Sequence, residues 1–139
     1  ERHKEDLSHH DYECHSLHYI PLIDQIVLFE NKGSWFKLYD CDLQLVRTIR
    51  GHRQRLLACA FAPKLGLITT SEDCTIRVWD HLHQFKEVMK LTTEGPHLAV
   101  CWFLNTLFSA DNTGDIVSWG LDHGDVRKRF TGHTDAVLA

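Results

Sequence analysis

Three residue types that nucleophilic hydrolases combine occur together in one stretch of the chain. His52, Thr69 and Asp73 supply an imidazole, a hydroxyl and a carboxylate within residues 51–80. In such enzymes the imidazole takes the proton of the hydroxyl, and the carboxylate orients the imidazole. A nucleophilic hydroxyl also needs a sharp turn that exposes its oxygen, and no such glycine-flanked pattern surrounds Thr69. The sequence therefore disfavours catalysis by these residues.

The N-terminal residues carry a second group of side chains that could do chemistry. Zinc prefers four nitrogen or sulfur ligands in a tetrahedral arrangement, and the candidates are His3, His9, His10, Cys14, His15 and His18. If residues 12–20 form a strand, Cys14 and His18 point to one face and His15 to the other. Because the ligands then do not converge, we expect no metal site here.

A third candidate is the acidic stretch 111–115, DNTGD, which is similar to the start of a calcium loop. An EF-hand has its glycine at the sixth position of the loop and a helix on each side. Here Gly114 is the fourth residue, and strand-like patterns flank the stretch. A turn between two strands accounts for these residues better.

The stretch that contains His52, Thr69 and Asp73 opens on Gly51-His52 and closes on Trp79-Asp80. Shifting the closing pair by 40 residues in either direction reaches Tyr39-Asp40 and Trp119-Gly120, each of which ends a hydrophobic strand-like pattern (WFKLYD, TIRVWD, DIVSWG). A repeat of about 40 residues is a signature of propeller blades. The sequence therefore predicts three consecutive units of one architecture.

Residues 51–80 resemble one unit of the WD-repeat family, and GHTDAV at 132–137 resembles the opening of another. The resemblance implies an all-β fold, a β-propeller segment of antiparallel four-stranded blades. We expect blade one at 10–50, blade two at 51–92, blade three at 93–131 and the start of a further blade at 132–139. Propellers close with about 4–8 blades and the sequence begins without Met, so we expect part of a larger propeller protein.

The resemblance also implies a structural tetrad in blade two. It places His52 in the loop before the first strand, Thr69 on the second strand, Asp73 in the following turn and Trp79 on the third strand. A carboxylate held by the imidazole, and a hydroxyl between the imidazole and the indole, would satisfy every buried polar group of the set. This structural role is the alternative to the catalytic interpretation of the same residues.

The other two blades depart from this pattern. Blade one has Phe29, Gly33 and Tyr39 at the positions of Thr69, Asp73 and Trp79, so we expect apolar packing in place of the tetrad. Blade three keeps a hydroxyl at Ser109, ten residues before Trp119, but has Thr93-Glu94 in place of Gly-His and Thr113 in place of the aspartate. We therefore expect its tetrad to be incomplete.

Two further tryptophans have no fixed role in the repeat. Trp102 lies at the position of Ala60 on a first strand, and we expect it to fill the core between blades two and three. Trp35 lies at the start of a third strand. If exposed, it could anchor a partner, and if buried, it would compensate for the missing tetrad of blade one.

Composition bounds the partners of the chain. Fifteen Lys and Arg against nineteen Asp and Glu give a formal net charge of -4. Nucleic-acid binding needs clustered positive charge, and the densest clusters, Arg50–Arg55 and Arg127–Arg129, are short. We therefore expect no nucleic-acid partner.

Five cysteines without a Cys-x-x-Cys pair indicate a reducing compartment, and the positions of Cys59 and Cys101 suggest small core residues. No apolar run approaches the length of a membrane span, and no signal-peptide pattern occurs in the first 30 residues. We expect an intracellular, cytoplasmic protein without membrane contact. A cytoskeletal or ciliary assembly is compatible with degenerate WD repeats, although no residue demonstrates it.

The family resemblance implies a non-catalytic scaffold that binds other proteins or peptides in a multiprotein assembly and needs no cofactor. Partners in the family sit on the rim formed by the loops before the first strand and between the second and third strands. By position this rim contains Arg53, Gln54, Arg55, Glu72, Asn112 and Thr134-Asp135. The alternative is a ligand or catalytic site in the central channel. The expected first strands disfavour it, because only one of them offers titratable imidazoles, His15 and His18.

Overall fold

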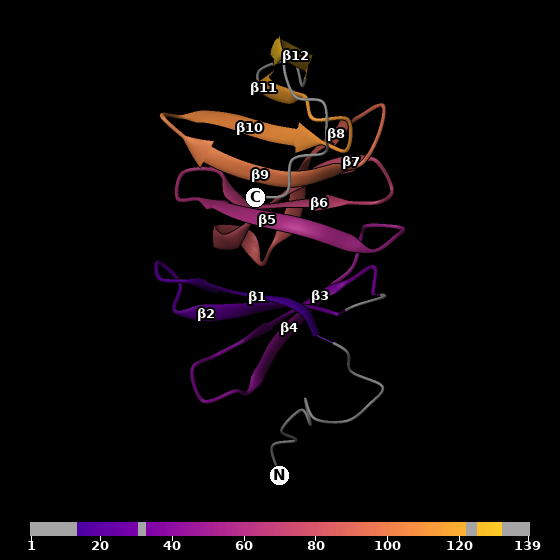
Figure 1. Cartoon of the computed structure of the whole chain (residues 1–139). Helices are drawn as coiled ribbons and strands as arrows, with labels where there is room; N and C mark the ends of the chain where they lie inside the picture. Colours follow the sequence, from indigo (N-terminus) through magenta and orange to yellow (C-terminus); the bar gives the residue numbers. More distant parts are fainter. Residues whose placement is uncertain (1–13, 31–32, 122–124, 132–139) are drawn as a thin grey trace. The chain divides into compact units, whose positions relative to one another are not determined.

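The computed structural model describes residues 14–30, 33–121 and 125–131 (Figure 1). These residues form three antiparallel four-stranded sheets, and the chain divides into two compact units, residues 1–56 and 57–139. In each sheet the strands follow one another in sequence order. The expected all-β fold of four-stranded antiparallel blades is confirmed.

The strands account for nearly all of the regular structure in the described residues. The first sheet consists of β1 (Cys14–Ile20), β2 (Gln25–Glu30), β3 (Phe36–Tyr39) and β4 (Leu45–Ile49). The second consists of β5 (Leu56–Ala62), β6 (Gly66–Ser71), β7 (Thr75–Asp80) and β8 (Lys86–Thr92), with a short 3-10 helix, His81–His83, between β7 and β8. The third consists of β9 (His97–Phe103), β10 (Thr106–Asp111), β11 (Ile116–Gly120) and β12 (Asp125–Phe130).

The 40-residue period of the sequence corresponds to one recurring irregularity of the sheets. In each sheet the pairing between the third and fourth strands shifts next to the aromatic residue that ends the motif, namely Tyr39, Trp79 or Trp119. Such bulges re-aim a side chain and increase the local twist. The three aromatic side chains are all buried, so the bulge recurs beside a buried aromatic residue in each sheet.

The first unit is held by apolar side chains of β2 and β3. Phe29, Phe36 and Leu38 are all buried, and the rings of Phe29 and Phe36 lie 6.2 Å apart at a tilt of 59°. Tilted aromatic pairs at this separation add to the stabilisation from burial alone. At the position where the tetrad hydroxyl would lie, Phe29 thus contributes apolar packing.

Trp35 is half-buried and contacts a cation of its own unit. The guanidinium carbon of Arg50 lies 4.8 Å from the centre of the Trp35 ring, a distance typical of cation–π pairs. Of the two alternatives for Trp35, the contact within the unit fits the stabilising role better than an unoccupied partner anchor.

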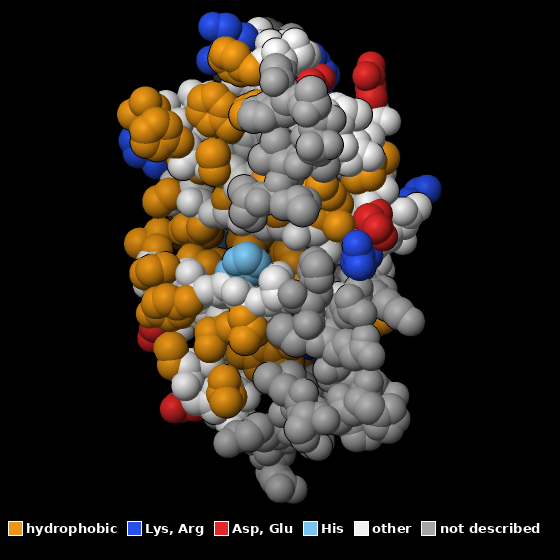
Figure 2. Space-filling view, in the orientation of Figure 1, with side chains coloured by type: hydrophobic (Ala, Val, Ile, Leu, Met, Phe, Trp, Pro, Cys, Tyr) orange, Lys and Arg blue, Asp and Glu red, His pale blue; other side chains and the backbone are white. Residues whose placement is uncertain are grey.

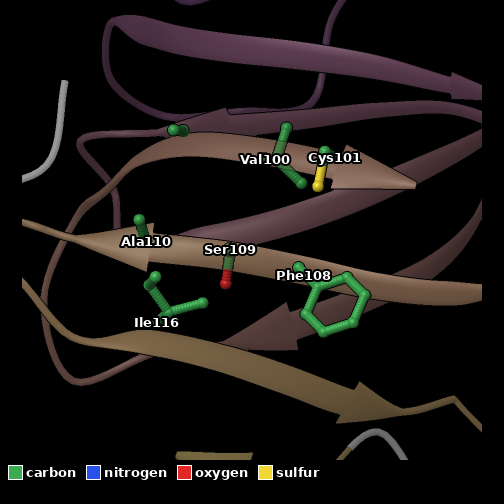
Figure 3. A pocket seen from close by; sticks show the side chains of 7 residues that line it. Val100, Cys101, Phe108, Ser109, Ala110 and Ile116 are labelled. Carbon is green, nitrogen blue, oxygen red and sulfur yellow. The ribbon is translucent and has the colours of Figure 1, made fainter. Parts of the chain in front are cut away.

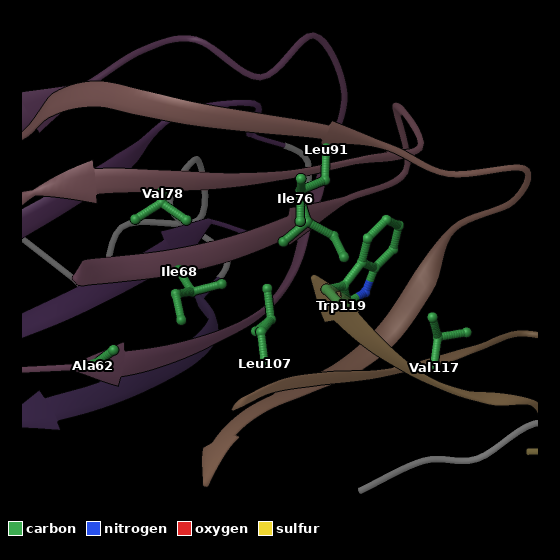
Figure 4. Packing of buried hydrophobic residues seen from close by; sticks show 8 residues of the cluster. All are labelled: Ala62, Ile68, Ile76, Val78, Leu91, Leu107, Val117 and Trp119. Atoms are coloured by element: carbon green, nitrogen blue, oxygen red, sulfur yellow. The ribbon is translucent and has the colours of Figure 1, made fainter. Parts of the chain in front are cut away.

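The second and third sheets share one hydrophobic core inside the second unit (Figure 4). Its buried members are Ala62, Ile68, Ile76, Val78 and Leu91 from the second sheet and Leu107, Val117 and Trp119 from the third. Trp102 packs against this cluster, as expected from its sequence position. Fully burying one such large side chain contributes about 1.5–3 kcal/mol, so the shared core couples the two sheets.

The strand connections of the second unit define two edges. The rim edge carries the β6–β7 turn (72–74), the β10–β11 turn (112–115) and the link 93–96 that joins β8 to β9. The opposite edge carries the β5–β6 turn (63–65), the β9–β10 turn (104–105) and the link 81–85 between β7 and β8. Alternate connections of an antiparallel sheet lie at opposite ends of its strands. No helix long and apolar enough to cross a bilayer occurs in the described part of the chain.

Candidate functional site

Two buried side chains of the second sheet form the centre of the predicted tetrad. Trp79 Nε1 donates to Thr69 Oγ1 at 2.8 Å, and the two residues are 2% and 0% exposed. The hydroxyl is therefore engaged and inaccessible to a substrate, which argues against Thr69 as a nucleophile. His52 is buried in the first unit, whereas Asp73 lies in the second. The complete tetrad of His52, Thr69, Asp73 and Trp79 thus stays a prediction.

Asp73 belongs to a chain of polar contacts that begins at the rim edge of the second sheet and continues along β7 to Glu87 on β8. Its Oδ1 accepts from the backbone N–H of Thr75 at 3.0 Å and from the Thr75 hydroxyl at 2.6 Å. The Arg77 guanidinium lies 3.7 Å from Asp73 Oδ2 and donates to Glu87 Oε1 at 3.0 Å. A nearly buried guanidinium between two carboxylates fixes the geometry of the β6–β7 turn.

The third sheet contains a histidine, serine and tryptophan network that the sequence did not predict. His97 Nδ1 lies 2.6 Å from Ser109 Oγ, and Trp119 Nε1 donates to the same oxygen at 2.9 Å. All three residues are buried. His97 thus supplies an imidazole although the Gly-His pair is missing, and the incomplete tetrad of blade three stays a prediction.

The carboxylate beside this imidazole is Asp111, two residues before the expected position at Thr113. Burial lowers the pKa of His97, and the charge of Arg129 lowers it further, while Asp111 opposes the shift. The imidazole is therefore neutral at pH 7, with one ring nitrogen as donor and the other as acceptor. A neutral His97 fits a structural role between Ser109 and the Asp111 turn.

Hydrogen bonds close the acidic stretch 111–115 into a turn. Asp111 Oδ1 accepts from the backbone N–H of Thr113 at 2.9 Å, from its hydroxyl at 2.7 Å and from the N–H of Asp115 at 3.0 Å. Burial raises the pKa of Asp111, but these hydrogen bonds together lower it below the usual value. Arg129 also donates to Asp115 Oδ2 at 3.1 Å. The carboxylates thus serve the turn, in agreement with the turn interpretation of this stretch.

The predicted rim residues of the second unit lie on its rim edge. Glu72 is exposed in the β6–β7 turn, and Asn112 is exposed in the β10–β11 turn. The link to β9 meets both turns: Thr93 donates from its backbone N–H to the carbonyl of Cys74 at 2.8 Å, and Asn112 Oδ1 lies 3.3 Å from where a Cβ on Gly95 would stand. The structure thus joins the two turns and the link into one polar edge.

The other predicted rim residues belong to the first unit and run directly into β5. Arg53 and Gln54 are exposed, and Arg55 is half-buried. Thr134-Asp135 lie outside the described residues. The partner-binding role of Arg53, Gln54, Arg55, Glu72 and Asn112 stays a prediction.

Metal binding finds no support among the residues that can be placed. No group of three or more His, Cys, Asp or Glu side chains in the described ranges is arranged to hold a metal ion. His18 Nε2 lies 3.1 Å from Ser16 Oγ, and its ring lies 5.6 Å from Phe29. His3, His9 and His10 lie outside the described residues, as do the side chains of Cys14 and His15.

An apolar hollow of about 190 Å³ lies on the third sheet (Figure 3). Phe108, Ala110 and Ile116 line it together with Val100 and Ser109, and they alternate along their strands with the core residues Leu107 and Val117. Cys101 also lines the hollow and is exposed, so the expectation that it is a core residue is wrong. This lining offers van der Waals contact rather than acid–base chemistry.

The comparisons with known proteins agree with this geometry. The family model described as WD40, "WD domain, G-beta repeat", matches residues 43–80. The nuclear distribution protein PAC1 of Arthroderma otae is 26% identical over 113 residues, which cover 70% of this chain and 24% of that protein. PAC1 of Fusarium vanettenii is 24% identical over 122 residues, which cover 77% of this chain and 27% of that protein. The chain spans about a quarter of the length of these curated relatives.

Solved structures show the same fold at low sequence identity. The structure of U3-55K superposes with a TM-score of 0.80 at 15% identity and covers 92% of this chain and 42% of that chain. A chain of the mitotic checkpoint complex gives a TM-score of 0.80 at 16% identity, with 92% and 40% covered. Residues 43–80 thus match one WD repeat, and the three four-stranded sheets have the fold of WD-repeat propeller blades.

Proposed function

We propose that this chain is a non-catalytic scaffold that holds other proteins or peptides in a multiprotein assembly through its polar rim. WD repeats are typical of protein-interaction scaffolds. The observation that carries the proposal is the rim edge itself, where Glu72 and Asn112 stand exposed on turns that buried and bridged side chains fix in place. A preorganised turn loses little conformational entropy when a partner binds.

The buried hydroxyl and carboxyl side chains near this edge support binding rather than catalysis. Thr69 is fully buried, Ser109 is occupied by His97 and Trp119, and Asp111 accepts three hydrogen bonds of its own turn. A nucleophile must reach its substrate, and neither hydroxyl does. The name of the relatives, nuclear distribution protein, supports an intracellular setting for the scaffold.

Charge reversal in the residues just before β5 tests the scaffold function. The protein is expressed at its native length in its own cells, and captured partners are identified by mass spectrometry for the wild type and for Arg53→Glu/Arg55→Glu. We expect the double variant to lose at least one specific partner, because arginine is enriched among the residues that dominate interface energies.

The matched control is Lys64→Glu, which reverses an exposed charge in the β5–β6 turn on the opposite edge. Lys64→Glu should retain that partner. The double variant and Lys64→Glu should show the same thermal unfolding. An unchanged set of partners in the folded double variant would contradict the placement of the rim. Absence of any protein partner would contradict the scaffold function.

A further inference from the structure

The most exposed large hydrophobic side chains of the second unit lie in or beside the connections of the opposite edge. Among its described residues, Leu104, Leu82 and Phe103 are the most exposed large hydrophobic ones, at 79%, 75% and 61%. Phe103 and Leu104 form the β9–β10 turn region, and Leu82 lies in the link between β7 and β8. Hydrophobic side chains at the surface of the second unit are visible in Figure 2. Clustered exposed apolar side chains often mark interaction sites.

Leu104 also has a backbone conformation that is unfavourable for leucine. Phe103 pairs with Thr106, so Leu104 and Asn105 form a two-residue turn, and both have positive φ, 52° and 57°. Turns of this kind favour Asn, Asp or Gly at both central positions, because a larger side chain meets its own backbone in the left-handed region. Leu104 is therefore neither buried nor in a backbone conformation that suits leucine. Strain that folding does not need is typical of functional positions.

The same edge carries two exposed lysines. Lys64 in the β5–β6 turn and Lys86 at the start of β8 are both exposed, and neither has an ion-pair partner in the described ranges. Asp80, directly before the link 81–85, is occupied by His83, whose Nδ1 lies 2.6 Å from Asp80 Oδ2. A binding segment would therefore meet apolar side chains flanked by two lysines.

We propose that the opposite edge is a second docking surface, which takes an acidic amphipathic segment of a partner protein. Apolar side chains of that segment cover Leu82, Phe103 and Leu104, and its carboxylates pair with Lys64 and Lys86. This surface extends the proposed scaffold function, yet it uses none of the rim residues.

The test begins with a photoreactive side chain at the edge. Phe103 is replaced by p-benzoylphenylalanine in the protein at its native length in its own cells, and the cross-linked segment is sequenced by mass spectrometry. We expect a segment with net negative charge and interspersed large apolar residues. The affinity of the protein for a synthetic peptide of that sequence is then measured for a set of variants.

Leu104→Asn is the decisive variant, because the proposal predicts opposite signs for two of its properties. Its urea midpoint should rise, since asparagine adopts the left-handed region more readily than leucine, while peptide affinity should fall about tenfold. Lys64→Glu/Lys86→Glu should weaken binding about fivefold or more at low salt, with a smaller effect at high salt. Val88→Thr, a control at an exposed position within β8, should bind as the wild type does.

Each of the other outcomes overturns the docking surface. Unchanged affinity of Leu104→Asn, or loss of binding together with a lower urea midpoint, would leave the turn a purely structural feature. A basic cross-linked segment, or a second copy of this chain, would contradict the proposed partner. Cross-linking to lipid, with flotation on phosphatidylcholine–phosphatidylserine vesicles, would replace the protein partner by a membrane surface. Arg53→Glu/Arg55→Glu should keep this affinity, which separates failure at this edge from failure at the rim.

Discussion

Ser109→Ala should lower the free energy of unfolding by about 2–4 kcal/mol, because one small side chain serves two buried partners. Its oxygen accepts from Trp119 Nε1 at 2.9 Å and lies 2.6 Å from His97 Nδ1. Alanine removes both contacts and leaves an indole N–H and an imidazole nitrogen buried without a partner. Urea denaturation followed by tryptophan fluorescence measures the change.

Ser118→Ala is the matched control for this prediction. Ser118 is 5% exposed and lies on β11, one residue before Trp119, yet its side chain has no hydrogen-bond partner in residues 14–30, 33–121 and 125–131. Its replacement should cost less than about 1 kcal/mol. The network also predicts that Ser109→Ala and Trp119→Phe are not additive. Equal costs for the two serines would contradict the network of the third sheet.

Gly66→Ala should destabilise the protein by about 2–4 kcal/mol, because backbone occupies the space that a side chain would need. Gly66 begins β6 with φ +132°, and an added Cβ would stand 2.1 Å from the carbonyl oxygen of Trp79 on β7. Neither strand can yield without breaking the pairing of Leu67 with Trp79. The unfolding midpoint of the purified variant measures this cost.

Gly95→Ala is the control for backbone strain. The nearest atom to its added Cβ is the side-chain oxygen of exposed Asn112, at 3.3 Å, which can move aside. Its effect should stay below about 1 kcal/mol. If Gly95→Ala were as destabilising as Gly66→Ala, close approach of β6 and β7 would not be the cause.

Periodicity made most of the fold predictable from the sequence. The 40-residue spacing of Tyr39, Trp79 and Trp119 corresponds in the structure to three buried aromatic residues beside bulges in three four-stranded sheets. The ten-residue spacing between hydroxyl and indole likewise corresponds to two hydrogen bonds, Trp79 to Thr69 and Trp119 to Ser109. Both spacings depend on neighbouring strands of one hairpin. They could therefore be predicted from the local sequence.

The residues that sequence analysis missed depend on links of variable length. His52 precedes Thr69 by 17 residues, whereas His97 precedes Ser109 by only 12, so a search at a fixed spacing of 17 reaches Thr92 instead. A search for any histidine at the start of the first strand would have found His97. Exposure of Cys101 and Leu104 was not predictable, because hydrophobic patterning indicates burial and both residues break that rule.

Hydrogen exchange with and without a partner tests the scaffold function and its rim most directly. The partner to use is one that the wild type and the Lys64→Glu variant both capture. We predict that it slows exchange in the β6–β7 turn at 72–74, the link 93–96 and the β10–β11 turn at 112–115, and leaves the β5–β6 turn at 63–65 unchanged. Unchanged exchange at all three rim segments in a saturated complex would contradict the proposal that this edge binds partners.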